Sequence, residues 1–270
     1  MNNYYEVTIE CDDPEKQEIL IAIFSSEGYE SFEQSGSFLK AFIPQGAYNA
    51  EILSTIAVKE GFAWTATLIE QQNWNALWES NFEPVQVDNF AGIRADFHPP
   101  FTDVEHDMVI TPKMSFGTGH HATTYMMMQL MRRLDFKHRS VFDFGSGTGI
   151  LAILAEKLGA SEVVAVDNDD WCIENATENV QINNCRNIKV EKSEILKFER
   201  KFDLILANIN RNIILENIHI LRQGLSKTGN ILFSGLLKED QKDIHDACQS
   251  VGFQHKATVE RGGWIALWYF

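Results

Sequence analysis

The chain has 270 residues, of which 44% are hydrophobic and 23% charged, and this is the composition of an ordinary globular protein. Its formal net charge of −15 argues against DNA, RNA or an anionic membrane as the main partner. An acidic surface favours a cationic partner such as a basic protein, although many acidic proteins are simply acidic.

The first 70 residues are predicted to form a small α+β domain. Apolar and polar residues alternate over residues 4–10, as they do in a half-buried strand. A helix is expected next, with an aspartate at its N-cap and Pro14 in its first turn. Two short strands, a second helix ending at Gly61 and a strand over residues 62–71 complete the order β-α-β-β-α-β. That order is the ferredoxin-like plan. Because no catalytic cluster is visible there, we interpret residues 1–70 as a substrate-recognition domain.

Residues 71–83 are predicted to form a linker helix. Trp74 and Trp78 are four residues apart and therefore share one helix face, and Pro84 ends the helical pattern. We favour a packing role for these two tryptophans over contact with a substrate.

Residues 84–270 predict a doubly wound, mostly parallel sheet, because short apolar strands alternate with helices. Two short strands are expected first, over residues 90–99 and 107–112. The later strands are expected over residues 140–144, 162–167, 188–193, 201–209 and 229–236, with an antiparallel pair within 254–270. The helices are expected over residues 125–134, 149–160, 171–183, 211–225 and 238–252.

A glycine-rich turn, DFGSGTG, runs from Asp143 to Gly149 after the first strand of this sheet. Doubly wound sheets bind ligands at the carboxyl ends of their strands, and Gly145 and Gly147 lack a Cβ, so a ligand can approach the backbone. The spacing G-x-G-x-G is neither the dinucleotide fingerprint nor a Walker loop, so the turn does not require a ligand that contains a pyrophosphate. The turn alone is weak evidence, since strand-to-helix turns favour glycine in general.

Polar residues end three further strands at the same predicted edge. We expect Asp167 to accept hydrogen bonds from the hydroxyl groups of a ribose, whereas Asp169 is well explained as a helix N-cap. Ser193 and Glu194 either flank an adenine or are ordinary loop residues. Asn208 ends an apolar strand, where its carboxamide either accepts a hydrogen bond from an amine or serves as a turn residue.

A second glycine-rich run, SFGTGHHATT, covers residues 115–124. His120 and His121 are adjacent, so they rarely point at one ion, and no Cys, His or Glu stands at ligand spacing. We therefore expect no metal site. The methionines that follow, 126–128, are expected to lie in a helix core.

Four scattered cysteines without a C-x-x-C pair are typical of reduced thiols in a cytosolic protein. No basic segment followed by an apolar run opens the chain, and no apolar run reaches the length of about 18 residues that crosses a bilayer. We therefore expect a cytoplasmic protein without a signal peptide or a membrane span.

Together these segments resemble the class I S-adenosylmethionine-dependent methyltransferases, whose Rossmann-like seven-stranded sheet ends in a reversed hairpin. The fuller pattern resembles the bacterial PrmA family, which methylates the eleventh protein of the large ribosomal subunit. The segments that carry this resemblance occur in the family's order: WNALWESNFEPVQV, SFGTGHHATT, DFGSGTGILAILAEKLGA, VDNDDWCIENATENVQIN, LANI and LFSGLL. A small N-terminal ferredoxin-like domain is the expected companion.

The resemblance implies S-adenosyl-L-methionine as methyl donor and lysine amines of that ribosomal protein as acceptors, with its N-terminal amine as a further candidate. The SFGTGHHATT segment is expected to close over the donor as a lid and side wall, and the enzyme is expected to be a monomer. Our own hypothesis is that Asn208 is the catalytic residue, whose side chain aims the amine lone pair at the methyl group. By the resemblance, the donor-binding residues are Thr124, Gly145, Asp167 and Asn208, and Phe116, Gly117 and Thr118 line the same pocket. The positions of Asp143, Gly147 and Ser193 at the strand ends add these three residues to the expected donor site.

The chain departs from the family pattern at Ala122, at Ser146 and at Asn210-Arg211. None of these removes a matched donor contact, but the change after Asn208 leaves the target geometry open. Two other functions also stay open: methylation of RNA or of a small-molecule amine, and a non-catalytic, donor-binding role in assembly. The N-P-P-[YF] signature of adenine N6 enzymes is absent, because the corresponding segment reads ANIN.

Overall fold

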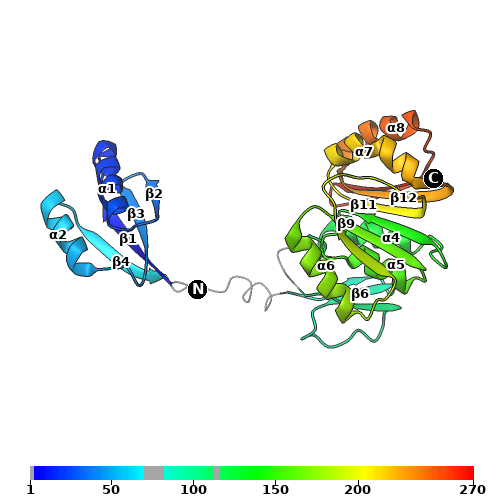
Figure 1. Cartoon of the computed structure of the whole chain (residues 1–270), viewed down its shortest axis with the longest axis horizontal. Helices are drawn as coiled ribbons and strands as arrows, with labels where there is room; N and C mark the ends of the chain where they lie inside the picture. The colour runs from blue at the N-terminus through cyan, green and yellow to red at the C-terminus, as the bar shows by residue number, and fades with distance from the viewer. Residues whose placement is uncertain (1–2, 70–81, 112–115) are drawn as a thin grey trace. The chain divides into compact units, whose positions relative to one another are not determined.

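The computed structural model describes residues 3–69, 82–111 and 116–270 (Figure 1). The chain divides into two compact units, Met1–Leu77 and Trp78–Phe270. Nearly all of the predicted linker helix, including Trp74 and Trp78, lies outside the described residues. No helix in the described part of the chain is both long and apolar enough to cross a bilayer.

The N-terminal unit is a four-stranded antiparallel sheet with two helices, and its elements follow the predicted order. They are β1 (Tyr4–Glu10), α1 (Pro14–Ser26), β2 (Ser31–Ser35), β3 (Phe38–Pro44), α2 (Ala50–Glu60) and β4 (Trp64–Ile69). The strands lie in the order β2-β3-β1-β4. Asp13 caps α1 by accepting from the backbone N–H groups of Glu15 and Lys16, as an N-cap aspartate does. Sheet and helices share one core, which includes Val7, Leu39, Phe24 and Leu53.

The C-terminal unit is built on a seven-stranded sheet in the order β10-β9-β8-β11-β12-β14-β13. Its elements are α4 (Ala122–Met131), β8 (Ser140–Phe144), α5 (Ile150–Lys157), β9 (Glu162–Asp167), α6 (Asp170–Ile182), β10 (Ile188–Lys192), β11 (Phe202–Asn208), α7 (Arg211–Gly224), β12 (Leu225–Leu237), α8 (Gln241–Ser250), β13 (His255–Arg261) and β14 (Trp264–Tyr269). Strands β8 to β12 are parallel, whereas β14 runs antiparallel to both β12 and β13. The predicted doubly wound sheet with a reversed final hairpin is confirmed.

Helices cover both faces of this sheet (Figure 1). Strand β11 shows the consequence, because its residues are buried alternately in two cores. Leu204 and Leu206 lie in the core that contains α4 and α5 residues, and Ile205 and Ala207 lie in the core that contains α7 and α8 residues. A strand covered on both faces is apolar throughout, which is why the sequence of β11 shows no polar alternation.

Helix α4 begins at Ala122, three residues before the predicted start at residue 125. The cause is His121, whose ring nitrogen Nδ1 accepts a hydrogen bond from the Thr123 backbone N–H and so caps the helix. The three methionines 126–128 are fully buried in the core, as expected.

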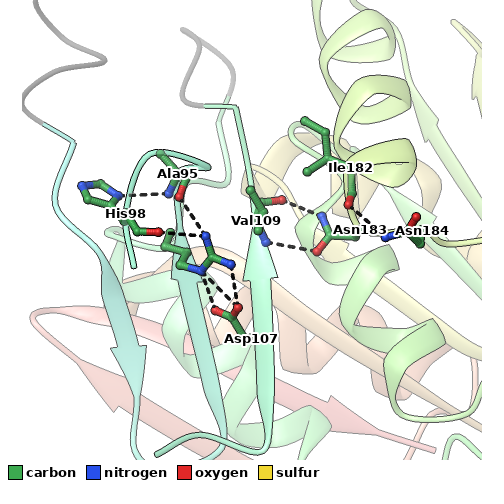
Figure 2. A network of polar contacts seen from close by, with 8 residues as sticks. Ala95, His98, Asp107, Val109, Ile182, Asn183 and Asn184 are labelled. Carbon is green, nitrogen blue, oxygen red and sulfur yellow. Dashed lines mark hydrogen bonds and ion pairs between the residues drawn. The ribbon is translucent and has the colours of Figure 1, made fainter. Parts of the chain in front are cut away.

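A small third sheet contains β5 (Val85–Val87), β6 (Ala91–Arg94) and β7 (His106–Val109). Strands β6 and β7 are shorter than predicted, and Arg94 on β6 forms a two-pronged ion pair with Asp107 on β7, at 2.9–3.0 Å. Figure 2 shows this ion-pair network and, beside it, the contact of Val109 with Asn183 at the end of α6.

Candidate functional site

A cavity of about 770 Å³ opens at the carboxyl ends of β8, β9 and β11. Strand β8 lies between β9 and β11, at the point where the winding of the sheet changes direction, and doubly wound sheets bind ligands there. The lining residues belong to the second unit. They come from the glycine turn, the end of β9 with the start of α6, the residues after β10, and the end of β11 with the start of α7, and they include Phe116, His121, Gly235 and Trp264.

The glycine turn forms the floor of this cavity. The backbone N–H groups of Gly145 and Ser146 both donate to the Val166 carbonyl, at 2.9 and 3.0 Å, which folds the turn over the end of β9. Gly145 and Gly147 adopt φ values of +74° and +53°, in the region that side chains disfavour. Both glycines line the cavity.

The second glycine-rich segment packs directly on the first. Residues 116–124, here named the wall segment, are held by Thr148: its N–H donates to the Phe116 carbonyl at 2.9 Å and its hydroxyl to the Gly117 carbonyl at 2.7 Å. Phe116 and His121 line the cavity from this segment. The two glycine-rich runs therefore belong to one site.

Gly147 is expected to tolerate no side chain. A Cβ built there lies 2.3 Å from the Phe116 carbonyl oxygen, so Gly147→Ala should push the wall segment away and lower the melting temperature. Gly262→Ala is the matched control, because Gly262 has a similar φ of +58° but nothing within 4 Å of its Cβ position. Thermal unfolding of both variants should show that Gly147→Ala lowers the free energy of unfolding by about 1–3 kcal/mol more than Gly262→Ala does. Equal losses would contradict the close packing of turn and wall.

Asp167 lies at the end of β9 and lines the cavity. Its oxygens accept backbone hydrogen bonds from Gly147 at 2.9 Å and from Asp169 at 3.2 Å. A carboxylate offers about four acceptor positions, so these two bonds orient Asp167 and leave further positions for a ligand. Asp169 caps α6 through the Trp171 N–H at 2.8 Å, which confirms the N-cap interpretation, and it also lines the cavity.

Asn208, at the end of β11, is 8% exposed and lines the cavity. Its Nδ2 donates to the hydroxyl of Thr124 at 3.4 Å, whereas its Oδ1 has no hydrogen-bond partner among the described residues. A buried polar atom without a partner at a cavity is a candidate for contact with a ligand. Thr124 itself is fully buried and does not line the cavity, so it lies behind Asn208.

Asp143, near the end of β8 and at the start of the glycine turn, is 1% exposed. Burial raises the pKa of its carboxyl group to about 7, the Ala152 backbone N–H acts in the opposite direction, and the negative charge of Asp167 raises the pKa further. A carboxyl group that titrates near neutral pH beside a cavity is a feature of functional sites, although structural networks also produce it.

The structure therefore places some of the predicted site residues at the cavity and others outside its lining. Those that line the cavity are Phe116, Gly145, Gly147, Asp167, Ser193 and Asn208, together with Glu194. Gly117, Thr118, Thr124 and Asp143 lie outside the lining. Thr118 instead contacts the His120 ring at 3.2 Å. The donor-binding roles of all these residues stay predictions.

Sequence reasoning missed two aromatic side chains that line the cavity together with Phe116, those of His121 and Trp264. The ring of His121 lies 4.6 Å from that of Trp264 and 5.3 Å from that of Phe116, measured between centroids. Among the described residues, no group of three His, Cys, Asp or Glu side chains could hold a metal ion.

The whole chain matches known proteins of one kind. The model of the family described as Ribosomal protein L11 methyltransferase (PrmA) matches residues 5–269. A ribosomal protein L11 methyltransferase of Porphyromonas gingivalis is 40% identical over 93% of this chain and 89% of its own length. One of Phocaeicola vulgatus is 34% identical over 98% of both chains.

A solved structure of a protein of this kind has a similar fold. The ribosomal protein L11 methylase of Lactobacillus delbrueckii subsp. bulgaricus superposes with a TM-score of 0.64 at 34% identity, over 70% of this chain and 98% of that one. The family match and the relatives agree over nearly the full length, and the shared fold agrees over 70% of the chain. The chain therefore belongs to the ribosomal protein L11 methyltransferase (PrmA) family of methyltransferase enzymes.

Proposed function

We propose that this enzyme transfers methyl groups from S-adenosyl-L-methionine to lysine amines of ribosomal protein L11, with the N-terminal amine as a further acceptor. The observation that carries the proposal is the cavity at the carboxyl end of β8, whose walls are built from the segments shared with the family. The net charge of −15 supports a basic protein as the partner. The expected cytoplasmic location and monomeric state fit this proposal and stay predictions.

The residues at the cavity fit the donor. The backbone at Gly145 and Gly147 allows close approach, and Asp167 keeps acceptor positions for the ribose hydroxyl groups. Ser193 and Glu194 line the part of the cavity beyond β10, where the adenine would lie. When bound, S-adenosylmethionine supplies a methyl group that is already activated by the positive sulfur. The protein therefore has mainly to position the partners and exclude water.

The acceptor amine must be neutral, because an ammonium group has no lone pair. A free lysine has a pKa near 10.4, so the site has to disfavour the charged form. The aromatic rings of Phe116, His121 and Trp264 border the same cavity and reduce the access of water there. We propose that Oδ1 of Asn208 accepts a hydrogen bond from the amine and so aims its lone pair at the methyl group.

Charges near the cavity favour entry of a cationic side chain. Glu216 lines the cavity on the exposed side of α7 and carries a negative charge. Arg211, at the start of the same helix, would repel a lysine, but it is ion-paired with Asp240 at 3.5 Å and with Asp243. The departure from the family pattern at Asn210-Arg211 therefore leaves no uncompensated arginine at the start of α7.

The affinity for the donor should rise with pH through about 7. Burial raises the pKa of Asp143 to about 7, so the group changes from neutral to negative over this range. A positively charged ligand favours the ionised carboxylate, so it binds more tightly above the pKa than below it. Calorimetric titration of S-adenosylmethionine from pH 6 to 8 should show this rise, of about tenfold at most.

Asp143→Asn serves as the control, since an amide does not titrate and should give a flat profile. Parallel pH profiles for the wild type and this variant would rule out Asp143 as the titrating group.

A labelling experiment distinguishes the proposed activity from the alternatives. The enzyme is incubated with S-adenosylmethionine carrying a labelled methyl group and, separately, with ribosomal protein L11, ribosomal RNA or small amines. Label is expected in L11 alone. Label only in RNA or in a small amine would reject the proposed substrate, and donor binding without label in any arm would favour a non-catalytic role.

A further inference from the structure

An asparagine ladder joins helix α6 to the edge of the small sheet. Asn175, Asn179 and Asn183 stand at four-residue intervals along α6 and its C-cap, so they share one face of the helix. That face lies against β7, which is the last strand of its sheet in the order β5-β6-β7.

The asparagine side chains pair with this edge as a neighbouring strand would. Asn183 accepts from the Val109 N–H at 3.0 Å and donates to the Val109 carbonyl at 2.5 Å, as Figure 2 shows. Two residues further on, the Thr111 N–H donates to Asn179 at 2.7 Å, and Asn175 donates to the Thr111 carbonyl at 3.4 Å. A carboxamide carries a donor and an acceptor in one plane, as a peptide group does, so it can replace strand pairing.

Asn179 differs from Asn183 because its amide also reaches the glycine turn. Its Nδ2 donates to the Thr148 carbonyl at 2.9 Å, and the residue is fully buried. Thr148 in turn holds Phe116 and Gly117 of the wall segment through its N–H and its hydroxyl. One side chain on α6 therefore connects the end of β7 with the floor of the cavity and, through Thr148, with its wall.

We propose that Asn179 is a positioning residue of the cavity. It fixes the Thr148 carbonyl, and through Thr148 it fixes the wall segment in the place that shapes the donor site. Asn179 does not line the cavity, so its effect passes through Thr148 and not through contact with a ligand. The inference rests on the proposed function only in naming S-adenosylmethionine as the occupant.

Two matched variants test this role. Asn179→Asp keeps the acceptor for Thr111 but loses the donor to the Thr148 carbonyl and to Oδ1 of Asn175. Asn183→Asp makes the same chemical change at the carbonyls of Val109 and Asn179, away from the glycine turn. For each variant we would measure KM for S-adenosylmethionine, kcat, calorimetric binding of the product S-adenosylhomocysteine, and hydrogen exchange of residues 116–124 in the ligand-free protein.

Asn179→Asp should raise KM and weaken product binding by about tenfold or more, with little change in kcat, because it removes the hydrogen bonds to Thr148 and Asn175 and sets a buried oxygen against both acceptors. It should also speed exchange in the wall segment. Asn183→Asp should leave KM and that exchange at the wild-type level. Wild-type values for Asn179→Asp, or equal effects from both variants, would overturn the positioning role.

Thr148→Val keeps the test decisive if Asn179→Asp does not fold. It removes the hydroxyl that holds Gly117 and should raise KM and wall exchange in the same direction, so unchanged values would overturn the proposal. Failure of the wild-type chain to bind S-adenosylhomocysteine would instead contradict the proposed function. The exchange comparison in the ligand-free protein would then still decide the role of Asn179.

Discussion

Asn208→Ala should reduce kcat by about 10²–10³-fold while changing the affinity for the methyl donor only a few-fold. The reason is that Oδ1 of Asn208 has no partner among the described residues, so it is available to accept a hydrogen bond from the neutral acceptor amine and to hold the amine lone pair towards the methyl group. Single-turnover methylation of L11 gives the rate of the chemical step, and calorimetry with S-adenosylhomocysteine gives the affinity of the donor site.

Asn212→Ala is the control for this change. It removes the same carboxamide from an exposed position in the first turn of α7 that does not line the cavity, and its kcat should equal that of the wild type. A wild-type kcat for Asn208→Ala would remove Asn208 from the chemical step. Equal losses of rate and of donor affinity would instead make it a binding residue alone.

Deleting residues 1–71 should leave donor binding intact and reduce methylation of L11 by about 100-fold or more. The two units have separate cores, and every residue that lines the cavity belongs to the second unit, so the donor site does not need the first. We propose that the N-terminal unit docks the ribosomal protein, and a truncated enzyme would then have to capture its substrate by random collision.

Calorimetry with S-adenosylhomocysteine provides the control for the truncation. Binding at wild-type affinity would show that the remaining unit folds, so that lost methylation can be attributed to lost docking. A truncated enzyme that modified L11 at the full rate would contradict the docking role of residues 1–71.

Local patterns predicted the fold well because each element carries its own signal. Period-two alternation identified β1, the N-cap aspartate and Pro14 placed α1, and the uninterrupted apolar run of β11 indicated a strand covered on both faces. The start of α4 was missed because its cap is a histidine, which is not among the preferred N-cap residues.

The site was predicted only where its residues follow strands. Gly145, Asp167 and Asn208 were found because parallel strands end at one edge, so their sequence positions imply proximity. Trp264 was missed because it opens β14, whose place beside β12 depends on the reversed hairpin and not on any local pattern. The ladder from α6 to β7 was missed for a similar reason, since asparagines in a helix look like ordinary surface residues until the facing strand edge is known.

The measurement that tests the central claim most directly is the intact mass of ribosomal protein L11 after incubation with this enzyme and S-adenosylmethionine. The proposal predicts that the mass of L11 increases by whole methyl groups, and that fragmentation places them on lysine side chains or on the N-terminal amine. An unchanged mass of L11, obtained with an enzyme that binds S-adenosylhomocysteine, would contradict it.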